Sequence, residues 1–335
     1  MNPKTTVKAW TYTAPGYPDT IKLTDYDIPS TPAPGHLLIK IHAVALNSVD
    51  ITLMNLPFWH IPWLQYPKVL CEDYSGTVIA AGENTSFKKG DTVFGFSKIP
   101  GRGGLAEVVH IREKGWFNAT VKKPDSLTHQ QAASLPLVWF TAKACMDSVI
   151  PYVTQENQKV AILGGSTGVG IYLIHLAKQQ GWEVLATCSA GNEELVKGLG
   201  ADSTADYTSQ NVREETTKFQ PDAIIDCVGG TECIGVARKR YVTIIGDKTD
   251  RNVMGGPSSY FHGPWQALRW VKGFLGLGER YDVVELGIST EHLLEASKLE
   301  AEKIIIDSVF PFSEVKSAFE RLETGRARGK IIIEI

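Results

Sequence analysis

Lys159-Val-Ala-Ile-Leu-Gly-Gly-Ser-Thr-Gly-Val-Gly170 runs directly into Ile171-Tyr-Leu-Ile-His-Leu-Ala-Lys178. The apolar run at 160–163 predicts a buried parallel strand, and apolar residues then recur at helical spacing. A strand, a glycine-rich turn and a helix open a dinucleotide-binding unit, whose helix N-terminus offers N–H groups and a positive dipole to a pyrophosphate. The fingerprint is incomplete, because Gly-x-Gly-x-x-Gly ending at Gly170 needs glycine where this chain has Thr167.

Strand-like and helix-like segments alternate from this stretch up to residue 247. Such alternation predicts parallel strands joined by right-handed helical crossovers, which is a doubly wound sheet of the Rossmann type. The fold class expected here is therefore α/β. The sequence predicts strands at 159–163, 183–187, 203–206, 222–227 and 240–246, and helices at 168–180, 192–199, 211–218 and 231–238.

The first 125 residues have a different pattern. Apolar and polar residues alternate there with a period of two, and Gly and Pro turns separate the segments, which predicts an irregular β-barrel. From His129 the composition becomes helical, and Pro136 divides two expected helices. The predicted organisation is a β-rich substrate domain of residues 1–130 and 301–335, to which the last strand returns, and a nucleotide-binding domain of residues 131–300.

Composition excludes several classes of protein. The 335 residues are 43% hydrophobic and 21% charged, with a net charge of −3, which gives no reason to expect nucleic acid or an anionic membrane as partner. No apolar run reaches the roughly 20 residues that span a bilayer. The start, Met1-Asn-Pro-Lys-Thr-Thr6, lacks the apolar core of a signal peptide, so a cytoplasmic location is expected. The scattered cysteines at 71, 145, 188, 227 and 233 form no zinc or disulfide motif.

A series of short motifs resembles the zinc-free quinone-oxidoreductase branch of the medium-chain dehydrogenase/reductase superfamily. The later motifs most resemble the reticulon-interacting reductases and their fungal relatives, and also fungal enoyl reductases of polyketide pathways. This resemblance covers nearly the whole chain except 247–282, and it implies a GroES-like β-barrel joined to a Rossmann domain. The motifs are Asn47-Ser-Val-Asp50, Glu72-Asp-Tyr-Ser-Gly76, Leu135-Pro-Leu-Val-Trp-Phe-Thr-Ala142, Gly165-Ser-Thr-Gly-Val-Gly170, the segment 188–202 and Gly325-Arg-Ala-Arg-Gly-Lys330.

The zinc ligands of the superfamily's alcohol dehydrogenases are missing. Those enzymes bind catalytic zinc with Cys, His and Cys. The matching positions here are Asn47, Glu72 and Leu137; leucine cannot bind a metal and asparagine is a poor zinc ligand. The segment 97–104, where the structural-zinc cysteines would lie, contains no cysteine. The prediction is therefore no metal, and hydrogen-bond donors must polarise the substrate oxygen. This favours reduction of an activated C=C over alcohol–ketone interconversion.

The second predicted strand indicates which nucleotide is bound. An NAD enzyme usually places Asp or Glu about 20 residues beyond the glycine turn, where it binds the ribose 2′-hydroxyl. Here the strand ends in Cys188 and Ser189, with no carboxylate at its tip. Ser189, Asn192 and Tyr207 can donate hydrogen bonds to a 2′-phosphate, so NADPH is the expected cofactor. Alternatively, Ser189 and Asn192 only cap the following helix.

The resemblance implies further cofactor contacts. Ser166, Gly168 and Val169 are expected at the pyrophosphate, with the Thr167 hydroxyl reaching a phosphate oxygen. Thr141 is expected near the nicotinamide, as a candidate catalytic residue. Gly246 is expected beside the nicotinamide pocket, and the turn that contains Ala327 and Arg328 is expected to fold over the cofactor.

The catalytic groups are less clear. In such a reaction hydride reaches the β-carbon while charge develops on the carbonyl oxygen, so one or two donors must face that oxygen. Asn47 is the first candidate donor, and the alternative is a structural turn asparagine. Related reductases often have Lys at the position of Thr52, and some have Tyr nearby. Because this chain has neither, the proton donor stays open, and Tyr260 and His262 are the candidate substitutes.

The predicted function is a zinc-independent NADPH reductase of quinones or α,β-unsaturated carbonyls. One alternative is an enoyl or double-bond reductase of a biosynthetic pathway, working with a partner synthase. Another is a protein that binds NADPH without turnover. The substrate is expected to be a small apolar or aromatic carbonyl compound, because aromatic residues concentrate at 57–66 and 260–270, where they line a pocket or form a docking patch. The resemblance also implies a homodimer.

Overall fold

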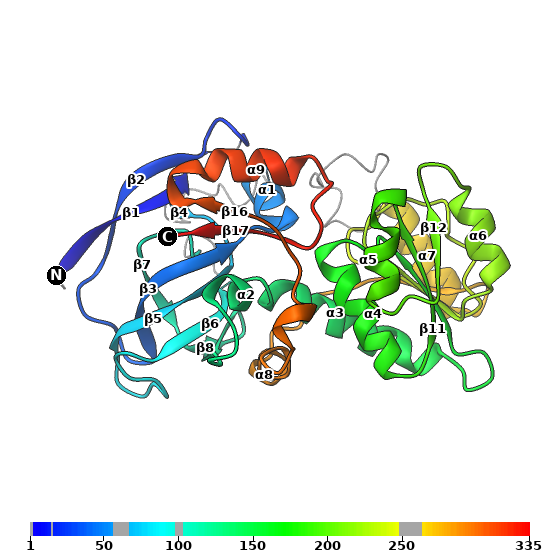
Figure 1. Ribbon diagram of the computed structural model, residues 1–335, viewed down its shortest axis with the longest axis horizontal. Coiled ribbons are helices and arrows are strands. Elements are labelled where there is room, and N and C mark those ends of the chain that lie inside the picture. The colour runs from blue at the N-terminus through cyan, green and yellow to red at the C-terminus, as the bar shows by residue number, and fades with distance from the viewer. Residues whose placement is uncertain (1–2, 15, 56–66, 98–102, 248–262) are drawn as a thin grey trace. The chain divides into compact units, whose positions relative to one another are not determined.

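The computed structural model describes residues 3–14, 16–55, 67–97, 103–247 and 263–335. The chain divides into two compact units, Met1–Leu137 with Ile288–Ile335 and Val138–Gly287 (Figure 1). The division differs from the predicted boundaries because helix α8 (Thr290–Ala296) packs on strand β9 (Asn118–Lys122) of the first unit. The side chain of Gln131 also donates a hydrogen bond to the carbonyl of Ala301 in that unit.

The first unit is built on β-sheets. An eight-stranded sheet has the order β16-β17-β3-β5-β6-β9-β8, with β7 paired to β3, and a three-stranded sheet has the order β2-β1-β4. The C-terminal β17 pairs antiparallel with β3, so the chain end returns to this unit as expected. The strands are β1 (Lys4–Tyr12), β2 (Lys22–Pro29), β3 (His36–Ala45), β4 (Lys68–Val69), β5 (Asp73–Ala81), β6 (Thr92–Ser97), β7 (Val108–Arg112), β8 (Lys114–Gly115), β9, β16 (Ile306–Pro311) and β17 (Lys330–Glu334).

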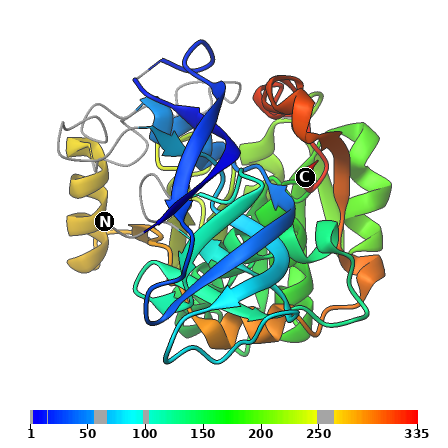
Figure 2. The same cartoon turned by 90° about the vertical axis from the view of Figure 1, so that its left-hand side faces the viewer.

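Short helices connect these strands, and α3 (Pro136–Val149) leads into the second unit. Helix α1 (Ser48–Asn55) follows β3. Helix α2 (His129–Ala133) begins with a capping box between Thr128 and Gln131, and α3 (Pro136–Val149) starts at the proline that was expected to divide two helices. Helix α9 (Val315–Glu323) buries one apolar face against β16 and β17 (Figure 2). Single 3-10 turns lie at Ile150–Tyr152, Ala190–Asn192, Ala301–Lys303 and Phe312–Glu314.

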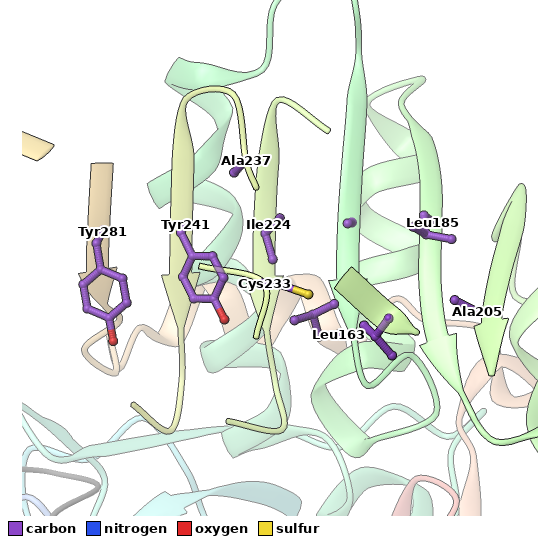
Figure 3. Packing of buried hydrophobic residues seen from close by; sticks show 10 residues of the cluster. Leu163, Leu185, Ala205, Ile224, Cys233, Ala237, Tyr241 and Tyr281 are labelled. Atoms are coloured by element: carbon purple, nitrogen blue, oxygen red, sulfur yellow. The ribbon is translucent and has the colours of Figure 1, made fainter. Parts of the chain in front are cut away.

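The second unit contains a parallel sheet in the order β12-β11-β10-β13-β14-β15. This is the order of a Rossmann sheet, with the reversal between β10 and β13. Alternate residues of the strands form an apolar cluster on one face, including Leu163, Leu185, Ile224 and Tyr241 (Figure 3). The strands are β10 (Lys159–Leu163), β11 (Glu183–Cys188), β12 (Ser203–Asp206), β13 (Ala223–Asp226), β14 (Arg240–Thr243) and β15 (Arg280–Val283). The helices are α4 (Gly168–Gln179), α5 (Glu193–Gly198), α6 (Val212–Phe219) and α7 (Pro264–Phe274).

One predicted helix of this unit is wrong. Residues 231–238 form turns and bends rather than a helix. Gly235 adopts a φ of +82°, and the Glu279 carboxylate accepts hydrogen bonds from the amides of Gly235 and Ala237. In a helix over 231–238 these two amides would bond backbone oxygens of the helix itself. Here they bond the Glu279 carboxylate instead. In addition, α7 lies within the segment 247–282 and β15 begins there, in a part of the chain for which the sequence pattern predicts no element.

No helix in the described ranges is long and apolar enough to cross a membrane.

Candidate functional site

The glycine turn after β10 is shaped by close backbone contacts. Gly164 adopts a φ of +93°, and a Cβ on Gly170 would lie 2.1 Å from the Gly164 oxygen. Thr167 is the N-cap of α4: its hydroxyl accepts from the Gly170 amide at 3.0 Å and donates to the Gly164 oxygen at 2.8 Å. The Thr167 proton predicted to reach a phosphate is therefore used inside the turn. The turn keeps α4 close to β10, with Ser166, Gly168 and Val169 at the helix N-terminus.

The tips of β11 and β12 lie beside this turn. Asn192 follows β11, and its Nδ2 donates to Ser166 Oγ at 3.1 Å. Ser189 and Asn192 are the N-cap residues of the 3-10 turn and of α5, but neither side chain makes a cap hydrogen bond. Tyr207 follows β12, and its amide donates to the Cys188 oxygen at 3.2 Å. The structure thus places Asn192 against Ser166, and the backbone of Tyr207 against Cys188, the residue before Ser189.

The polar atoms at these tips fit a nucleotide. Asn192 Oδ1 is buried, and within the described part of the chain nothing donates to it, which leaves it available to a ligand hydroxyl or amino group. The nearby acids are engaged elsewhere. Glu193 bonds Lys197 and Thr204, and these contacts lower the pKa of its carboxyl. The Asp206 carboxylate accepts bonds from residues 208 and 209 of its own loop.

The predicted nicotinamide-side residues lie in the same unit. Gly246 follows β14 with a φ of +78°, and its amide donates to Thr243 Oγ1 at 3.0 Å. Thr141 is half-buried on α3. Its proximity to the nicotinamide stays a prediction.

Asn47 belongs to a buried polar network of the β-rich unit. Its Nδ2 donates to Asp73 Oδ2 at 2.9 Å and to the Ala45 oxygen at 3.4 Å, and its Oδ1 accepts from the Lys330 ammonium. The backbone amide of Asn47 donates to Asp50 Oδ2 at 2.8 Å. Burial raises the pKa of the Asp73 carboxyl and raises that of Asp50 to about 7. Because both side-chain amide protons of Asn47 are directed at protein oxygens, the geometry supports the structural interpretation of this residue.

The same network shows that the donor set does not suit zinc. The Lys330 ammonium donates a hydrogen bond to Asn47 Oδ1, and its Nζ lies 3.3 Å from Asp73 Oδ2. The backbone amide of Leu137 donates to Asp73 at 2.9 Å, and its aliphatic side chain cannot bind a metal. Across the residues that the structure describes, no group of three or more His, Cys, Asp or Glu side chains could hold a metal. A lysine cation thus compensates the buried carboxylate here.

The turn that contains Ala327 and Arg328 is fixed by an ion pair. Arg321 bonds both oxygens of Asp307, at 2.9 and 2.7 Å, and also donates to the Arg326 oxygen at 3.2 Å. Asp307 in turn accepts from the Arg328 amide at 2.9 Å. The cofactor contact of this turn stays a prediction.

Several predicted residues lie outside the described ranges. They include the candidate proton donors Tyr260 and His262 and the aromatic residues of 57–66. Thr52 is buried on α1, where its hydroxyl donates to the Ser48 oxygen at 3.3 Å.

Sequence reasoning missed the roles of Lys330, Asp73 and Asp226. Each is a fully or almost fully buried charged residue at a strand terminus: Asp73 and Lys330 begin their strands, and Asp226 ends its strand. The available signal was a charged residue next to an apolar run, as in Lys330-Ile-Ile-Ile and Ile224-Ile-Asp226. Such a residue must find partners in the fold, because an unpaired buried charge is strongly unfavourable.

Comparison with known proteins agrees with this architecture. The alcohol dehydrogenase GroES-like domain matches residues 33–125, and the zinc-binding dehydrogenase domain matches residues 199–333. The NAD(P)H oxidoreductase RTN4IP1, mitochondrial, of Bos taurus is 32% identical over 374 residues, covering 100% of this chain and 91% of the relative. The trans-enoyl reductase pgmF of Aspergillus terreus is 29% identical, covering 98% of this chain and 96% of the relative. The quinone oxidoreductase from Coxiella burnetii has 28% identity and a TM-score of 0.80, covering 99% of this chain and 100% of that one.

Proposed function

Because the chain belongs to the quinone-oxidoreductase branch of the medium-chain dehydrogenase/reductase superfamily, we propose that it is an NADPH-dependent, zinc-independent reductase of activated C=C bonds or quinones. Membership of this family makes it an oxidoreductase that uses a nicotinamide cofactor. The preference for NADPH, the independence of zinc and the substrate class are the proposal.

The observation that carries the proposal is the carboxylate-free tip of β11. Ser189 and Asn192 follow β11, Asn192 bonds Ser166, the backbone of Tyr207 bonds Cys188, and the neighbouring Glu193 is paired with Lys197. A 2′-phosphate placed at this tip would meet hydroxyl and amide donors instead of a repelling carboxylate. An NAD enzyme would instead need an acid here to bind the ribose 2′-hydroxyl.

The Lys330 network supports the zinc-independent part of the proposal. In the β-rich unit, Asn47 and Asp73 are bonded to a lysine and are not arranged as metal ligands. NADPH, when bound, supplies the hydride, and the protein orients the substrate and excludes water. An activated C=C or a quinone suits this chemistry, because neither requires a metal to polarise an alcohol oxygen.

A panel of quinones, 2-alkenals and enones tests the proposal, with NADPH oxidation followed by absorbance and a chelator added to half of the samples. We expect turnover with at least one member and no effect of the chelator. Tight NADPH binding without turnover on any member would instead support a non-catalytic NADPH-binding protein.

A second candidate is a pathway-specific enoyl reductase acting with a partner synthase. It is favoured by the similarity to trans-enoyl reductase pgmF, which extends over 98% of this chain. Enoyl thioesters of increasing chain length would distinguish the two. A pathway enzyme should reduce an extended enoyl thioester with a far higher kcat/KM than any simple quinone or alkenal.

The proposal also includes a homodimer formed through the second unit. Strand β15 ends the parallel sheet in the described part of the chain, and it pairs with β14 on its inner side. Beside it, α7 exposes Trp265, Trp270 and Phe274 at 70%, 52% and 64%. A sheet edge next to exposed aromatic side chains favours pairing with a second copy of the same surface.

The cytosol is the proposed location. The RTN4IP1 relatives are named mitochondrial. The five cysteines are buried free thiols, which suits a reducing compartment. Fractionation of cells that produce the full-length protein decides the matter: recovery with a mitochondrial marker would contradict this part of the proposal.

A further inference from the structure

Asp226 is a fully buried carboxylate at the end of β13. Its Oδ1 accepts from the amides of Val228 at 3.0 Å and Gly229 at 2.9 Å. Its Oδ2 accepts from the hydroxyl groups of Tyr241 at 3.2 Å and Thr243 at 3.1 Å. The turn after β13 and the strand β14 therefore direct donors at one carboxylate, which satisfies a buried charge that would otherwise be strongly unfavourable.

Thr243 extends this arrangement into the next turn. Because its hydroxyl donates to Asp226, its oxygen lone pairs are free to accept from the amides of Ile245 at 3.3 Å and Gly246 at 3.0 Å. Gly246 has a positive φ, which is a backbone conformation that few residues other than glycine adopt. One carboxylate thus fixes the turn after β13 directly and the turn after β14 through Thr243.

The turn after β14 is held at its other end as well. Arg269 of α7 bonds both oxygens of Asp247, at 2.6 and 2.7 Å, and the Tyr281 hydroxyl donates to Asp247 at 3.2 Å. The rings of Tyr241 and Tyr281 stack with centroids 5.7 Å apart, and both hydroxyl groups point toward the carboxyl ends of the strands (Figure 3). The turn after β14 is therefore held at its start by Thr243 and Asp226, and at its end by the bonds of Asp247 to Arg269 and Tyr281.

The turns after β13 and β14 lie where a doubly wound sheet binds its ligand. Ligands of doubly wound sheets bind at the carboxyl ends of the strands and across the reversal of strand order. The residues suited to a 2′-phosphate lie on the β10–β11–β12 side of that reversal, at Ser166, Ser189 and Tyr207. The other half of a dinucleotide must then lie on the side of β13 and β14, where Asp226 fixes both turns.

We infer that Asp226 is a positioning residue for the nicotinamide half of the cofactor, acting through Thr243 and the two turns. The inference rests on the proposed cofactor site, although it holds for NADPH and NADH alike. Asp226 itself does not react. It sets the turn geometry against which the nicotinamide binds.

The test compares the affinities of NADPH and of adenosine 2′,5′-bisphosphate, which lacks the nicotinamide half, by titration calorimetry. The variants are Asp226→Asn, Thr243→Val and the conservative Thr243→Ser. We expect the first two to weaken NADPH binding by about tenfold, the scale of a lost hydrogen bond to a charged group. Binding of the bisphosphate should stay unchanged, and Thr243→Ser should bind NADPH like the parent protein.

Other outcomes would overturn the inference. Equal losses for both ligands would indicate a general structural role, and unchanged NADPH binding in Thr243→Val would remove the link through Thr243. If Asp226→Asn does not fold, Thr243→Val still provides the comparison. If the parent protein prefers NADH, the proposed cofactor is wrong, and the same selective loss is then expected for NADH relative to adenosine monophosphate.

Discussion

Asn47 bonds Asp73, Lys330 and a backbone oxygen inside the β-rich unit. Replacing it with alanine would leave a buried carboxylate and a buried ammonium each short of one partner. We expect Asn47→Ala to lower the free energy of unfolding by about 1–3 kcal/mol. Urea denaturation measures this loss, and Ser48→Ala, an exposed neighbour, serves as the control.

The kinetic consequence separates the two interpretations of Asn47. A structural residue should leave kcat of the folded protein close to that of the parent. Loss of an oxyanion donor would instead lower kcat by about a hundredfold or more. Such a decrease with unchanged stability would restore Asn47 as a catalytic candidate.

Ser189 gives the corresponding test of cofactor choice. In Ser189→Asp a carboxylate would stand at the tip of β11, where it repels a 2′-phosphate and can bind a 2′-hydroxyl. We expect the ratio of kcat/KM for NADPH to that for NADH to fall by about tenfold or more. Ser313→Asp makes the same charge change at an exposed site of the other unit and should leave the ratio unchanged. An unaltered ratio in Ser189→Asp would show that the 2′-phosphate binds elsewhere.

At the scale of elements, the packing of α4 against its glycine turn determines the nucleotide-binding end of the sheet. A Cβ on Gly170 would meet the Gly164 oxygen at 2.1 Å, whereas Gly198 in α5 has no atom within 4 Å of its Cβ position. We expect Gly170→Ala to destabilise the protein by about 1–3 kcal/mol and to weaken cofactor binding. Gly198→Ala should stabilise it by about 0.4–1 kcal/mol. Thermal unfolding and cofactor titration measure both, and similar behaviour of the two variants would contradict the packing argument.

The elements differ in how far the sequence predicts them. Residues 159–206 follow their local pattern, and β10, α4, β11, α5 and β12 lie within a few residues of the predicted ranges. The segment 231–238 does not, because Glu279, more than forty positions away in the chain, bonds the amides of Gly235 and Ala237. Contacts of that range leave no periodic signal in the sequence.

The candidate site shows the same division. Ser166, Ser189, Asn192 and Tyr207 are predictable because each follows a strand or turn whose position the pattern sets. The role of Asn47 is not, because it depends on Lys330, which reaches it from the opposite end of the chain. The Asp226–Thr243 link likewise requires the register of β13 against β14.

For the whole molecule, the exposed face of α7 predicts the oligomeric state. If β15 and α7 pair with a second copy, light scattering should give the mass of a dimer, and Phe274→Glu should shift it toward the monomer. Trp116→Glu alters an aromatic residue that is 92% exposed in the other unit and should leave the dimer intact. A monomeric parent protein at micromolar concentration would contradict the predicted dimer.

The central claim is that the chain is a reductase that selects NADPH through the carboxylate-free tip of β11. The most direct test is the steady-state rate of cofactor oxidation with a 2-alkenal, measured with NADPH and with NADH. We expect a kcat/KM for NADPH at least about tenfold higher than that for NADH, because no acid is present to bind the ribose 2′-hydroxyl. Equal or higher efficiency with NADH would contradict it.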